Sequence, residues 1–425
     1  MVEIKPLRAI RYTQKAGDLA DMITQPYDQI DAAAQKEYYQ KSPYNYCRVV
    51  LPMEENKYEA AQQRVGQWLK EGILVRDAEP AIFVSCQEFI LDRQKLARTG
   101  FIAAMQLYEY SENVVFPHEG TYGAPKADRL KMLRAVQKDL ESVMVIYSDP
   151  EKKTVSFFDE VVQTKPVVRV TDGLGVKHTV WKITDPQKIM LLQSELRGKT
   201  VVITDGHHRY ESALAYRDEM RRKGGWTQLS AFNFHMCYMV PIQEEGLIVL
   251  PTHRLLKECK LTQQTMDELA KFFDVVEVNP AVEALEGFLK GHVREHAFCV
   301  YAGSKAFGLT LKHEKSVYDF VSAHVSKETR IFDVVILRDI VFKHILKTGR
   351  LNLDENILYV RGTKEAVEKV NRGEASIAFL VNPISAQTVA EIAQQHELLP
   401  EKSTDFYPKM VSGLMMMDIS PSERL

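Results

Sequence analysis

The sequence predicts a mixed α+β protein, and three patterns lead to this expectation. An apolar, β-branched run at 201–203 passes through a glycine turn into a segment with helical spacing that begins at Tyr210. Large apolar residues alternate with smaller or polar ones from Phe232 to Val240, which is the spacing of a strand. In the last third of the chain, strand-like and helix-like runs follow one another as they do in α/β proteins.

The individual elements are expected from apolar spacing and from the glycine or proline residues beside them. In the first part of the chain, we expect a helix at 58–70, strands at 80–89 and 97–110, a helix at 130–136 and a buried strand at 143–147. In the later part, we expect a strand at 247–250, a helix at 262–272, a hairpin across 302–304, a helix at 333–347, a strand at 357–360, a helix at 363–371, a strand at 377–381 and a helix at 386–395.

The length of 425 residues predicts roughly two or three domains, because single cores stop growing at about 250–300 residues. We expect an N-terminal α+β region at 1–110, a core at 111–255 that holds the turn after residue 203, and a C-terminal α/β domain at 256–425.

Charge and cysteine content narrow the class of protein. The chain has 55 basic and 57 acidic residues and a net charge of −2, which gives no general attraction to nucleic acid or to an anionic membrane. Five cysteines, none in a CxxC spacing, are typical of reduced thiols. No apolar run approaches the roughly 20 residues that span a bilayer, and the first residues lack the apolar core of a signal peptide. We therefore expect a cytoplasmic protein without membrane or nucleic-acid partners.

The most informative motif is Asp205-Gly206-His207-His208-Arg209, which joins the strand-like run at 201–203 to the following helix. A helix that begins directly after a glycine turn points unpaired N–H groups and the positive end of its dipole at one spot, which suits a phosphate. The arginine adds charge-assisted donors, and the histidines add groups that move protons near neutral pH. The motif therefore predicts phosphate chemistry.

Two other interpretations of this turn stay open. In the first, Asp205 is only the helix N-cap, Gly206 a turn residue, and the histidines ordinary surface residues. In the second, His207 and His208 bind zinc, although adjacent histidines rarely point at one metal and no HExxH or CxxC motif completes a ligand set.

A second candidate site is Pro117-His118-Glu119, followed by Thr121 and the pair Asp128-Arg129. Catalytic groups often lie in loops at strand ends, and a carboxylate there either accepts a proton from a hydroxyl or holds Mg²⁺. The alternative is a solvated loop with an ion pair. We expect Glu119 to act on the substrate and Arg129 to contact phosphate.

A third candidate site is Pro400-Glu401-Lys402-Ser403-Thr404, with Lys409 shortly after it. Hydroxyl and ammonium groups in a loop bind phosphate or a carboxylate, although a plain polar surface loop has the same composition. Thr252-His253-Arg254 and Gln25-Pro26-Tyr27-Asp28 are weaker signals, typical of ordered turns that line a cleft.

These blocks, in this order, resemble the bacterial and archaeal family called domain of unknown function 1015. The matching segments extend over nearly the whole chain: ITQPYDQI, SPYNYCRVVLP, VFPHEGTYGAPKADRLKML, VVITDGHHRYESAL, VLPTHRLL, FDVVILRDIV and LLPEKSTDFYPKMVSGL. That resemblance gives a family without a reaction.

A more distant resemblance links the same three blocks, together with SIAFLVNPISAQTVAEIAQQ, to the free serine kinases of the ParB/sulfiredoxin superfamily. It implies a ParB/sulfiredoxin-like nucleotide-binding core, to which this chain adds its N-terminal region and its C-terminal domain. It also implies transfer of a phosphoryl group from ATP or ADP to the hydroxyl of free L-serine with Mg²⁺. Glu119 would be the catalytic carboxylate, 205–209 would contact nucleotide phosphates and Mg²⁺, and Ser403 and Thr404 would lie in the loop that engages serine.

Departures from the superfamily exclude two of its other activities. His207 occupies the position of the sulfiredoxin cysteine, so the sulfur chemistry is absent, and the chain has no basic helix-turn-helix for partition-type DNA binding. The segment between Glu119 and Asp205 is longer than in the kinases, and 1–110 has no counterpart there, which leaves the substrate open.

The expected site therefore combines residues from all three blocks. Catalysis falls to Glu119, His207 and His208, phosphate binding to 205–209 with Arg129, and tentative Mg²⁺ binding to Asp205 and Glu119. Substrate contacts are expected from His118, His253, Arg254, Lys402, Ser403, Thr404 and Lys409. The alternatives are a phosphoserine-type phosphatase or phosphotransferase, a non-catalytic nucleotide-binding regulator and a metal-dependent hydrolase.

Overall fold

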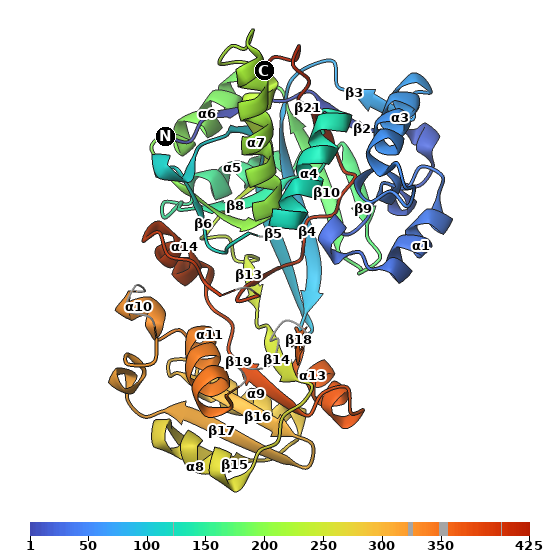
Figure 1. Cartoon of the computed structure of the whole chain (residues 1–425). Coiled ribbons are helices and arrows are strands. Elements are labelled where there is room, and N and C mark those ends of the chain that lie inside the picture. Colours follow the sequence, from blue (N-terminus) through green and yellow to red (C-terminus); the bar gives the residue numbers. More distant parts are fainter. Residues whose placement is uncertain (122, 322–325, 348–355, 401) are drawn as a thin grey trace. The chain divides into compact units, whose positions relative to one another are not determined.

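The computed structural model describes residues 1–121, 123–321, 326–347, 356–400 and 402–425. It divides into two compact units (Figure 1). Unit 1 contains 1–117, 121–248 and 408–425, and unit 2 contains 118–120 and 249–407. The division expected near residue 110 lies inside unit 1, because the first hundred residues fold together with the segment that holds the 205–209 turn.

Unit 1 is built on a mixed sheet that has nine strands in the described part of the chain. Its strands are β1 (Ile4–Lys5), β4 (Ile82–Leu91), β5 (Gln94–Gln106), β6 (Val115–Pro117), β8 (Val143–Tyr147), β9 (Val168–Thr171), β10 (Lys177–Ile183), β11 (Val201–Asp205) and β12 (Phe234–Pro241). The order is β6-β11-β8-β12-β5-β4-β10-β9, with β1 paired to β5. Only the β6–β11 and β8–β12 pairs are parallel among the described pairings.

The β6–β11 pair positions the candidate site, because its two strands end side by side. Val115 pairs with Val201, and Pro117 pairs with Ile203. The chain continues from Pro117 to Glu119 and from Ile203 to Asp205. Parallel pairing in this register makes β6 and β11 of unit 1 end at the same edge of the sheet.

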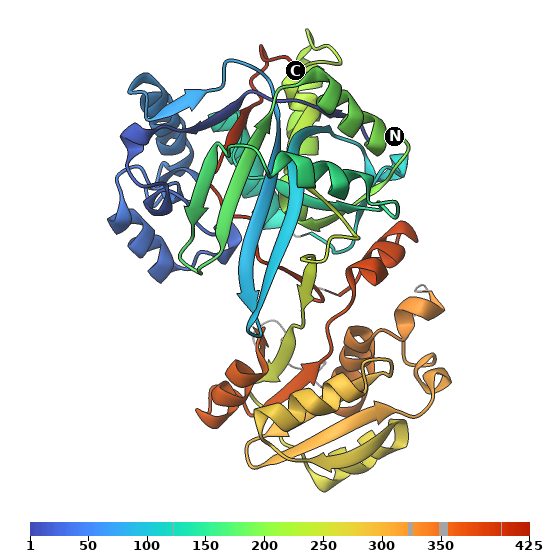
Figure 2. The ribbon, with the colours of Figure 1, turned by 180° about the vertical axis from the view of Figure 1, so that it is seen from behind.

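Helices cover both faces of this sheet. The covering helices are α4 (Gly123–Val136), α5 (Lys153–Val161), α6 (Pro186–Leu196) and α7 (His207–Lys223), while α1 (Ala32–Lys41), α2 (Cys47–Val50) and α3 (Lys57–Lys70) lie to one side of the sheet (Figures 1 and 2). Figures 1 and 2 show α4 and α7 on one face and α5 and α6 on the other. Glu211 of α7 accepts hydrogen bonds from Thr121 and Lys126, both at 2.8 Å, which fastens α7 to the start of α4.

A second, four-stranded sheet joins the ends of the chain inside unit 1. It consists of β3 (Leu74–Arg76), β2 (Ala9–Tyr12), β21 (Met416–Asp418) and β7 (Lys138–Asp139). Helices α2 and α3 pack beside it on a core that includes Tyr46, Val65 and Trp68. The N-terminal region is therefore bound to the C-terminal segment and to the residues just before β8.

Unit 2 contains a six-stranded sheet in which every described pairing is antiparallel. Its order is β15 (Phe273–Val278), β17 (Lys305–Leu311), β16 (Ala297–Ala302), β19 (Ile377–Val381), β14 (His253–Leu256), β18 (Ile357–Val360). The helical segments are α8 (Gln263–Phe272), α9 (Val282–Gly291), α10 (Lys327–Arg330), α11 (Asp333–Ile336), the π-helical Leu337–Ile345, α13 (Thr363–Asn371) and α14 (Ala386–Gln394). A short pair, β13 (Ile248–Leu250) with β20 (Asp405–Tyr407), stands apart from the large sheet.

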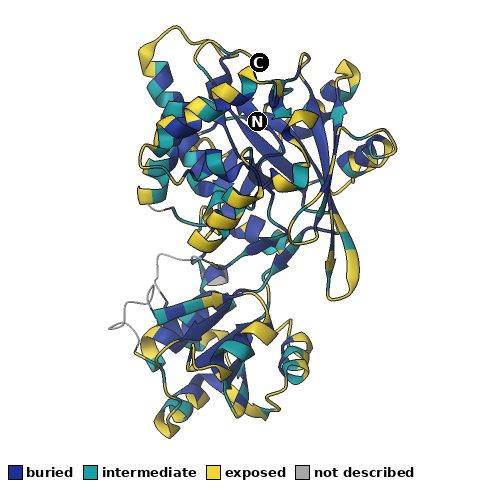
Figure 3. Ribbon diagram, turned by 90° about the vertical axis from the view of Figure 1, so that its right-hand side faces the viewer, coloured by how far each residue is buried: buried dark blue, intermediate teal, exposed yellow. Residues whose placement is uncertain are grey.

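The mixed α+β class predicted from the sequence is confirmed, and most elements differ from expectation only at their ends. The strand expected to reach residue 110 stops at Gln106, and two residues further on the N–H and C=O groups of Tyr108 bond the Tyr210 hydroxyl at 3.0 and 2.9 Å instead of a neighbouring strand. The helix expected at 130–136 begins at Gly123. Strand β12 is buried on both faces, so its polar residues do not face solvent (Figure 3).

Two further expectations concern the whole chain. In the described residues, no helix combines the length and apolar character needed to cross a membrane. All five cysteines are free thiols, and four of them are buried.

Candidate functional site

The helix α7 begins as the sequence predicts, directly after a glycine turn. Gly206 is the N-cap residue with φ 89°, in the left-handed region where glycine is favoured, and the first helical bond runs from Tyr210 N–H to the Gly206 carbonyl. A Cβ at position 206 would lie 2.8 Å from Nε of Arg209, so a larger residue would collide with the guanidinium. No side chain caps the helix. This is the local geometry that the sequence predicted for a phosphate-binding turn.

Asp205 does not cap α7 but holds two cations. Its Oδ2 accepts from Arg209 at 2.5 Å, and its Oδ1 accepts from Lys409 at 2.8 Å. Burial alone would raise the pKa of Asp205, but Lys409 and Arg209 outweigh it and hold that pKa well below its ordinary value. Arg209 also donates to the Ser142 carbonyl at 2.5 Å. The charges of the turn are therefore fixed in place before any ligand arrives.

Lys409 reaches Asp205 because two residues of the β4–β5 hairpin hold its main chain. Gln87 Nε2 donates to the Lys409 carbonyl at 3.1 Å, and the fully buried Arg98 donates to the carbonyl of the preceding proline. Gln87 and Arg98 bond each other through Oε1 and Nε at 3.1 Å. The sequence predicted Lys409 as a site residue but gave no sign of this support.

The N-terminal region adds the segment Tyr27–Asp28 to the surroundings of the turn. Tyr27 N–H donates to Glu141 Oε1 at 3.2 Å, and Glu141 also accepts from the Ser412 hydroxyl at 2.5 Å. Thr24 pairs with Ser412 in an antiparallel bridge. Because Glu141 precedes the residue that accepts from Arg209, these bonds place 27–28 next to the turn.

Asp28 is a candidate site residue for which the sequence gave only a weak signal. Its side chain is exposed, and among the described residues its carboxylate has no hydrogen-bond or ion-pair partner. Surrounding protein raises its pKa, and the charge of Asp205 raises it further. The only sequence signal was the QPYD turn, which was expected to line a cleft.

Arg129, expected to contact phosphate, is instead buried in structural contacts. Its guanidinium donates to Asp128 Oδ2 at 3.0 Å and to the Val50 carbonyl at 3.0 Å, and it lies 4.1 Å from the centre of the Tyr27 ring. Asp128 also accepts from Lys57 at 2.6 Å. Burial opposes ionisation of Asp128, but these cations lower its pKa to about 2. Arg129 therefore supports the 27–28 segment, and its contact with a phosphate stays a prediction.

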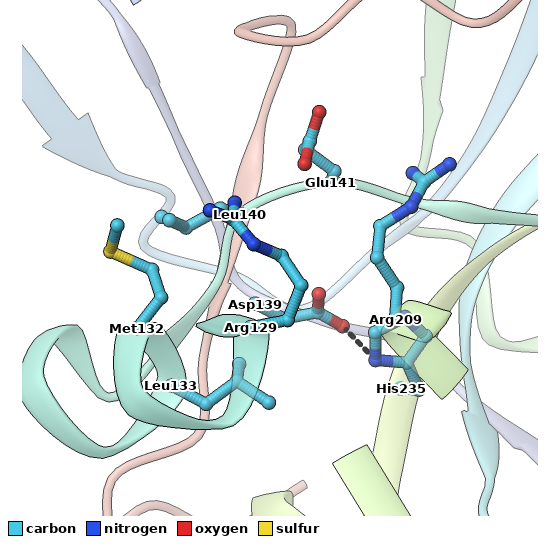
Figure 4. A pocket seen from close by; sticks show the side chains of 8 residues that line it. All are labelled: Arg129, Met132, Leu133, Asp139, Leu140, Glu141, Arg209 and His235. Carbon is cyan, nitrogen blue, oxygen red and sulfur yellow. Dashed lines mark ion pairs between the residues drawn. The ribbon is translucent and has the colours of Figure 1, made fainter. Parts of the chain in front are cut away.

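Arg209 of the turn also lines a small cavity (Figure 4). Its volume of about 30 Å³ holds about one water molecule and no nucleotide. Arg129, Arg209, Glu141 and His235 are among the lining residues, and His235 Nδ1 lies 2.7 Å from Asp139 Oδ2. Nε2 of His235 is buried and has no partner among the described residues. The guanidinium groups of Arg129 and Arg209 both line this cavity.

The other half of the predicted residues lies in unit 2. The buried His118 ring contacts the Thr404 hydroxyl through Nε2 at 2.7 Å, and the His118 carbonyl accepts from Leu399 N–H at 2.8 Å. Glu119 forms a parallel bridge with Leu399 and is half-buried. The second and third candidate motifs are therefore in direct contact, as the sequence had not shown.

His253 and Arg254 lie next to that loop on β14. Burial and the charge of Arg254 lower the pKa of His253 to about 4, so the imidazole is neutral near pH 7. Arg254 Nη1 donates to the Thr252 carbonyl at 2.7 Å, and Nη2 lies 3.4 Å from the Lys402 carbonyl. Ser403 is buried, and its hydroxyl donates to the Pro400 carbonyl. Glu401 lies outside the described residues.

The structure thus gathers the predicted residues into two groups. Unit 1 holds 205–209, Arg129 and Lys409, and unit 2 holds His118, Glu119, His253, Arg254 and 402–404. Within the described ranges, no three or more histidine, cysteine, aspartate or glutamate side chains are placed to hold a metal ion. The zinc interpretation of His207 and His208 therefore has no ligand set there.

These features define an α+β protein in which a strand passes through a glycine turn, held by the Asp205–Arg209–Lys409 ion pairs, into a helix. The chain belongs to the family described as protein of unknown function (DUF1015), which it matches over residues 4–335. That membership confirms the expectation drawn from the sequence blocks.

No curated protein matches the chain. Among solved structures, a free serine kinase variant in complex with ADP is 12% identical, with 73% of this chain and 90% of that chain covered and a TM-score of 0.36. A conserved hypothetical protein from Pyrococcus furiosus is 13% identical, with 70% and 90% covered and a TM-score of 0.33. SbnI from Staphylococcus aureus is 9% identical, with 75% and 87% covered and a TM-score of 0.34.

Proposed function

We propose that this protein is a small-molecule kinase that transfers a phosphoryl group from ATP or ADP to a hydroxyl, with free L-serine as the preferred acceptor, in the cytoplasm. The observation that carries the proposal is the α7 turn, where an uncapped helix start lies beside a fixed Asp205–Arg209–Lys409 network. Phosphoryl transfer depends mainly on positioning and on stabilising charge, and this turn supplies both without rearrangement.

The backbone N–H groups of 207–209 precede the first helical bond of α7, and the start of a helix is where anions commonly bind. The terminal phosphate of the nucleotide would lie there, with the helix dipole stabilising the charge that develops on the transferred group. Arg209 contributes mainly by holding the turn, because its guanidinium is already committed to Asp205 and to the Ser142 carbonyl.

Glu119 would accept the proton from the acceptor hydroxyl as the hydroxyl oxygen attacks phosphorus, a role worth about 10²–10⁴ in rate. Its assignment is supported by the chain path, since Glu119 follows Pro117, the register partner of Ile203, which itself precedes Asp205. His207 and His208 would share the proton transfer. His118, His253, Lys402, Ser403 and Thr404 would contact or position the acceptor, as would Lys409 from unit 1.

Mg²⁺ would arrive with the nucleotide and neutralise part of its phosphate charge. The chain fits a water-mediated contact to that ion better than a direct bond from Asp205, because both carboxylate oxygens already accept from cations. Mg²⁺ commonly keeps several waters and uses one or two carboxylates together with phosphates, so Glu119 remains a candidate ligand.

The test separates turnover from binding. Glu119→Gln is expected to lower serine phosphorylation about 10²–10⁴-fold while nucleotide affinity stays nearly unchanged. Arg209→Ala is expected to weaken nucleotide binding itself, because the turn loses the contacts of Arg209 with Asp205 and with the Ser142 carbonyl. Turnover is followed by phosphoserine formation and binding by calorimetry, with the exposed Glu160→Gln of α5 as the control.

Full activity in Glu119→Gln would show that another group accepts the proton. Phosphoserine incubated with ADP, and phosphoserine alone, distinguish the kinase from a phosphotransferase or phosphatase. Nucleotide binding without turnover over a panel of hydroxyl compounds would instead favour a regulatory module.

A further inference from the structure

Arg254 is a buried cation without an acidic partner. Only 5% of the residue is exposed. Its described contacts are two main-chain carbonyl oxygens, at 2.7 and 3.4 Å, and the ring of Tyr359, whose centre is 5.9 Å away. No carboxylate among the described residues forms an ion pair with it.

Among the described residues, three of the other four buried arginines pair with a carboxylate, and the fourth, Arg98, bonds Gln87 and the Pro408 carbonyl. Arg209 pairs with Asp205, Arg129 with Asp128, and Arg217 with Glu109 and Asp218. Burying a charge is costly unless a counterion compensates it, and the cost at Arg254 is visible in its pKa, which burial lowers to about 10. At neutral pH the guanidinium is still charged, so unit 2 keeps a positive charge that its own described residues do not neutralise.

The neighbours of Arg254 include the 402–404 loop and the adjacent His253. The Lys402 carbonyl lies 3.4 Å from Nη2 of Arg254, which places the start of the 402–404 loop beside the guanidinium. Lys402 has φ 56°, in the left-handed region that few side chains adopt, so the loop holds a special conformation beside the arginine. The adjacent His253 is neutral and adds no competing charge. A guanidinium carries five N–H donors in a planar fork, which matches carboxylate and phosphate oxygens.

We propose that Arg254, with the 402–404 loop, binds an oxyanion of the acceptor, either its carboxylate or the phosphate of the phosphorylated product. This inference rests on the proposed function for the identity of the ligand and narrows it to hydroxyl compounds that carry an acid group. The anion would supply the counterion that Arg254 lacks, so binding and stability are linked at this residue.

Arg254→Met tests the proposal because it removes the charge and keeps an unbranched side chain. A buried charge without a partner destabilises the fold, so the ligand-free variant is expected to melt at the same temperature as the wild type or higher. Arg217→Met, at a buried but ion-paired arginine of unit 1, is the matched control and is expected to melt several degrees lower.

Ligand arms identify the anion. L-serine, O-phosphoserine and inorganic phosphate are added to the wild type, to Arg254→Met and to Arg254→Lys, with ethanolamine and O-phosphoethanolamine as partners that lack the carboxylate. We expect thermal shifts for acid-bearing ligands in the wild type, loss of at least about tenfold in affinity in Arg254→Met, and a partial loss in Arg254→Lys. A response to serine but not to ethanolamine identifies the carboxylate, and a response to O-phosphoethanolamine identifies the phosphate.

Two outcomes would overturn the proposal. A marked fall in the melting temperature of ligand-free Arg254→Met, or failure of that variant to fold, would mean that the arginine is structural. Equal affinity of the wild type and Arg254→Met for every acid, including no affinity in either, would remove the anion site. Both readouts are independent of nucleotide, so a protein without kinase activity can still pass this test, and an active kinase can fail it.

Discussion

The two groups of predicted residues treat buried charge in opposite ways. In unit 1, Arg209 and Lys409 both bond Asp205, and the turn is neutralised internally. In unit 2, Arg254 is equally buried but contacts only carbonyl oxygens and a ring. The comparison teaches that the charges of the turn are balanced within the protein, whereas Arg254 is the group that a bound anion would balance. A paired network fixes geometry, and an unpaired charge creates a demand for a counterion.

The histidines follow the same rule. His235 of unit 1 lies 2.7 Å from the carboxylate of Asp139. His253 of unit 2 lies next to Arg254, and its nearest described partners are the Val381 N–H at 3.3 Å and the Thr363 hydroxyl at 3.4 Å. The unit 1 histidine therefore lies beside a carboxylate, whereas the unit 2 histidine lies beside a guanidinium.

The largest expected effect comes from breaking the unit 1 network. Asp205→Asn leaves Arg209 and Lys409 buried without their counterion, so the free energy of unfolding is expected to fall by about 3–5 kcal/mol. Urea denaturation at pH 7 measures the loss, with the exposed Asp159→Asn as the control. A loss below about 1 kcal/mol would mean that the two cations find other partners and that their ion pairs with Asp205 do not stabilise the fold.

A smaller effect is expected from acid acting on unit 2. The folded-state pKa of His253 is about 4, below the ordinary value of 6.5, so between these values the unfolded chain binds the proton more readily. Stability contributed by the neutral imidazole is therefore full above about pH 6.5 and is lost as the pH falls towards 4, by about 3 kcal/mol at most. His253→Asn keeps an acceptor for the Val381 N–H and should remove this slope.

Denaturation of the wild type and of His253→Asn between pH 4 and pH 7 gives the difference directly, because groups common to both cancel. Parallel curves for the two proteins would contradict a buried neutral histidine beside Arg254.

Local elements of the fold were predictable because their signals are local. The strands at 143–147, 357–360 and 377–381 and the helix at 363–371 have the expected bounds, since apolar spacing alone defines a buried strand or an amphipathic helix. The glycine turn before α7 was predictable for the same reason. The end of β5 was not, since just beyond it Tyr108 bonds Tyr210, a residue about a hundred positions later.

The contacts among the candidate site residues were not predictable from the sequence. Nothing in the sequence near Asp205 indicates that Lys409 bonds it, or that Gln87 and Arg98 hold the Lys409 main chain. Arg129 shows the converse, since its charge suggested phosphate while a distant ring and an adjacent carboxylate engage it. Residue type predicts chemistry, whereas partners that are far apart in the sequence decide whether the side chain is free to perform it.

The smallest expected effect on stability is at Asp28, an unpaired charge of unit 1 that can be compared with Arg254 of unit 2. This carboxylate lacks a partner, as Arg254 does, but it is exposed, so water carries most of its solvation. Its pKa is raised by surrounding protein and by Asp205, so ionisation costs the folded state slightly. Stability from the protonated form is full at low pH and is lost as the pH rises through the folded-state pKa of Asp28.

Asp28→Asn is therefore expected to match the wild type at about pH 3 and to exceed it by no more than about 0.5 kcal/mol at pH 7, as measured by urea denaturation. A fall in stability at pH 7 would instead show that Asp28 has a cationic partner in solution. The two unpaired groups differ in exposure. The exposed carboxylate of Asp28 is solvated by water, so its charge costs the fold little free energy. The buried guanidinium of Arg254 has no such solvation, so under the proposal an anion that binds there would raise the stability of the fold.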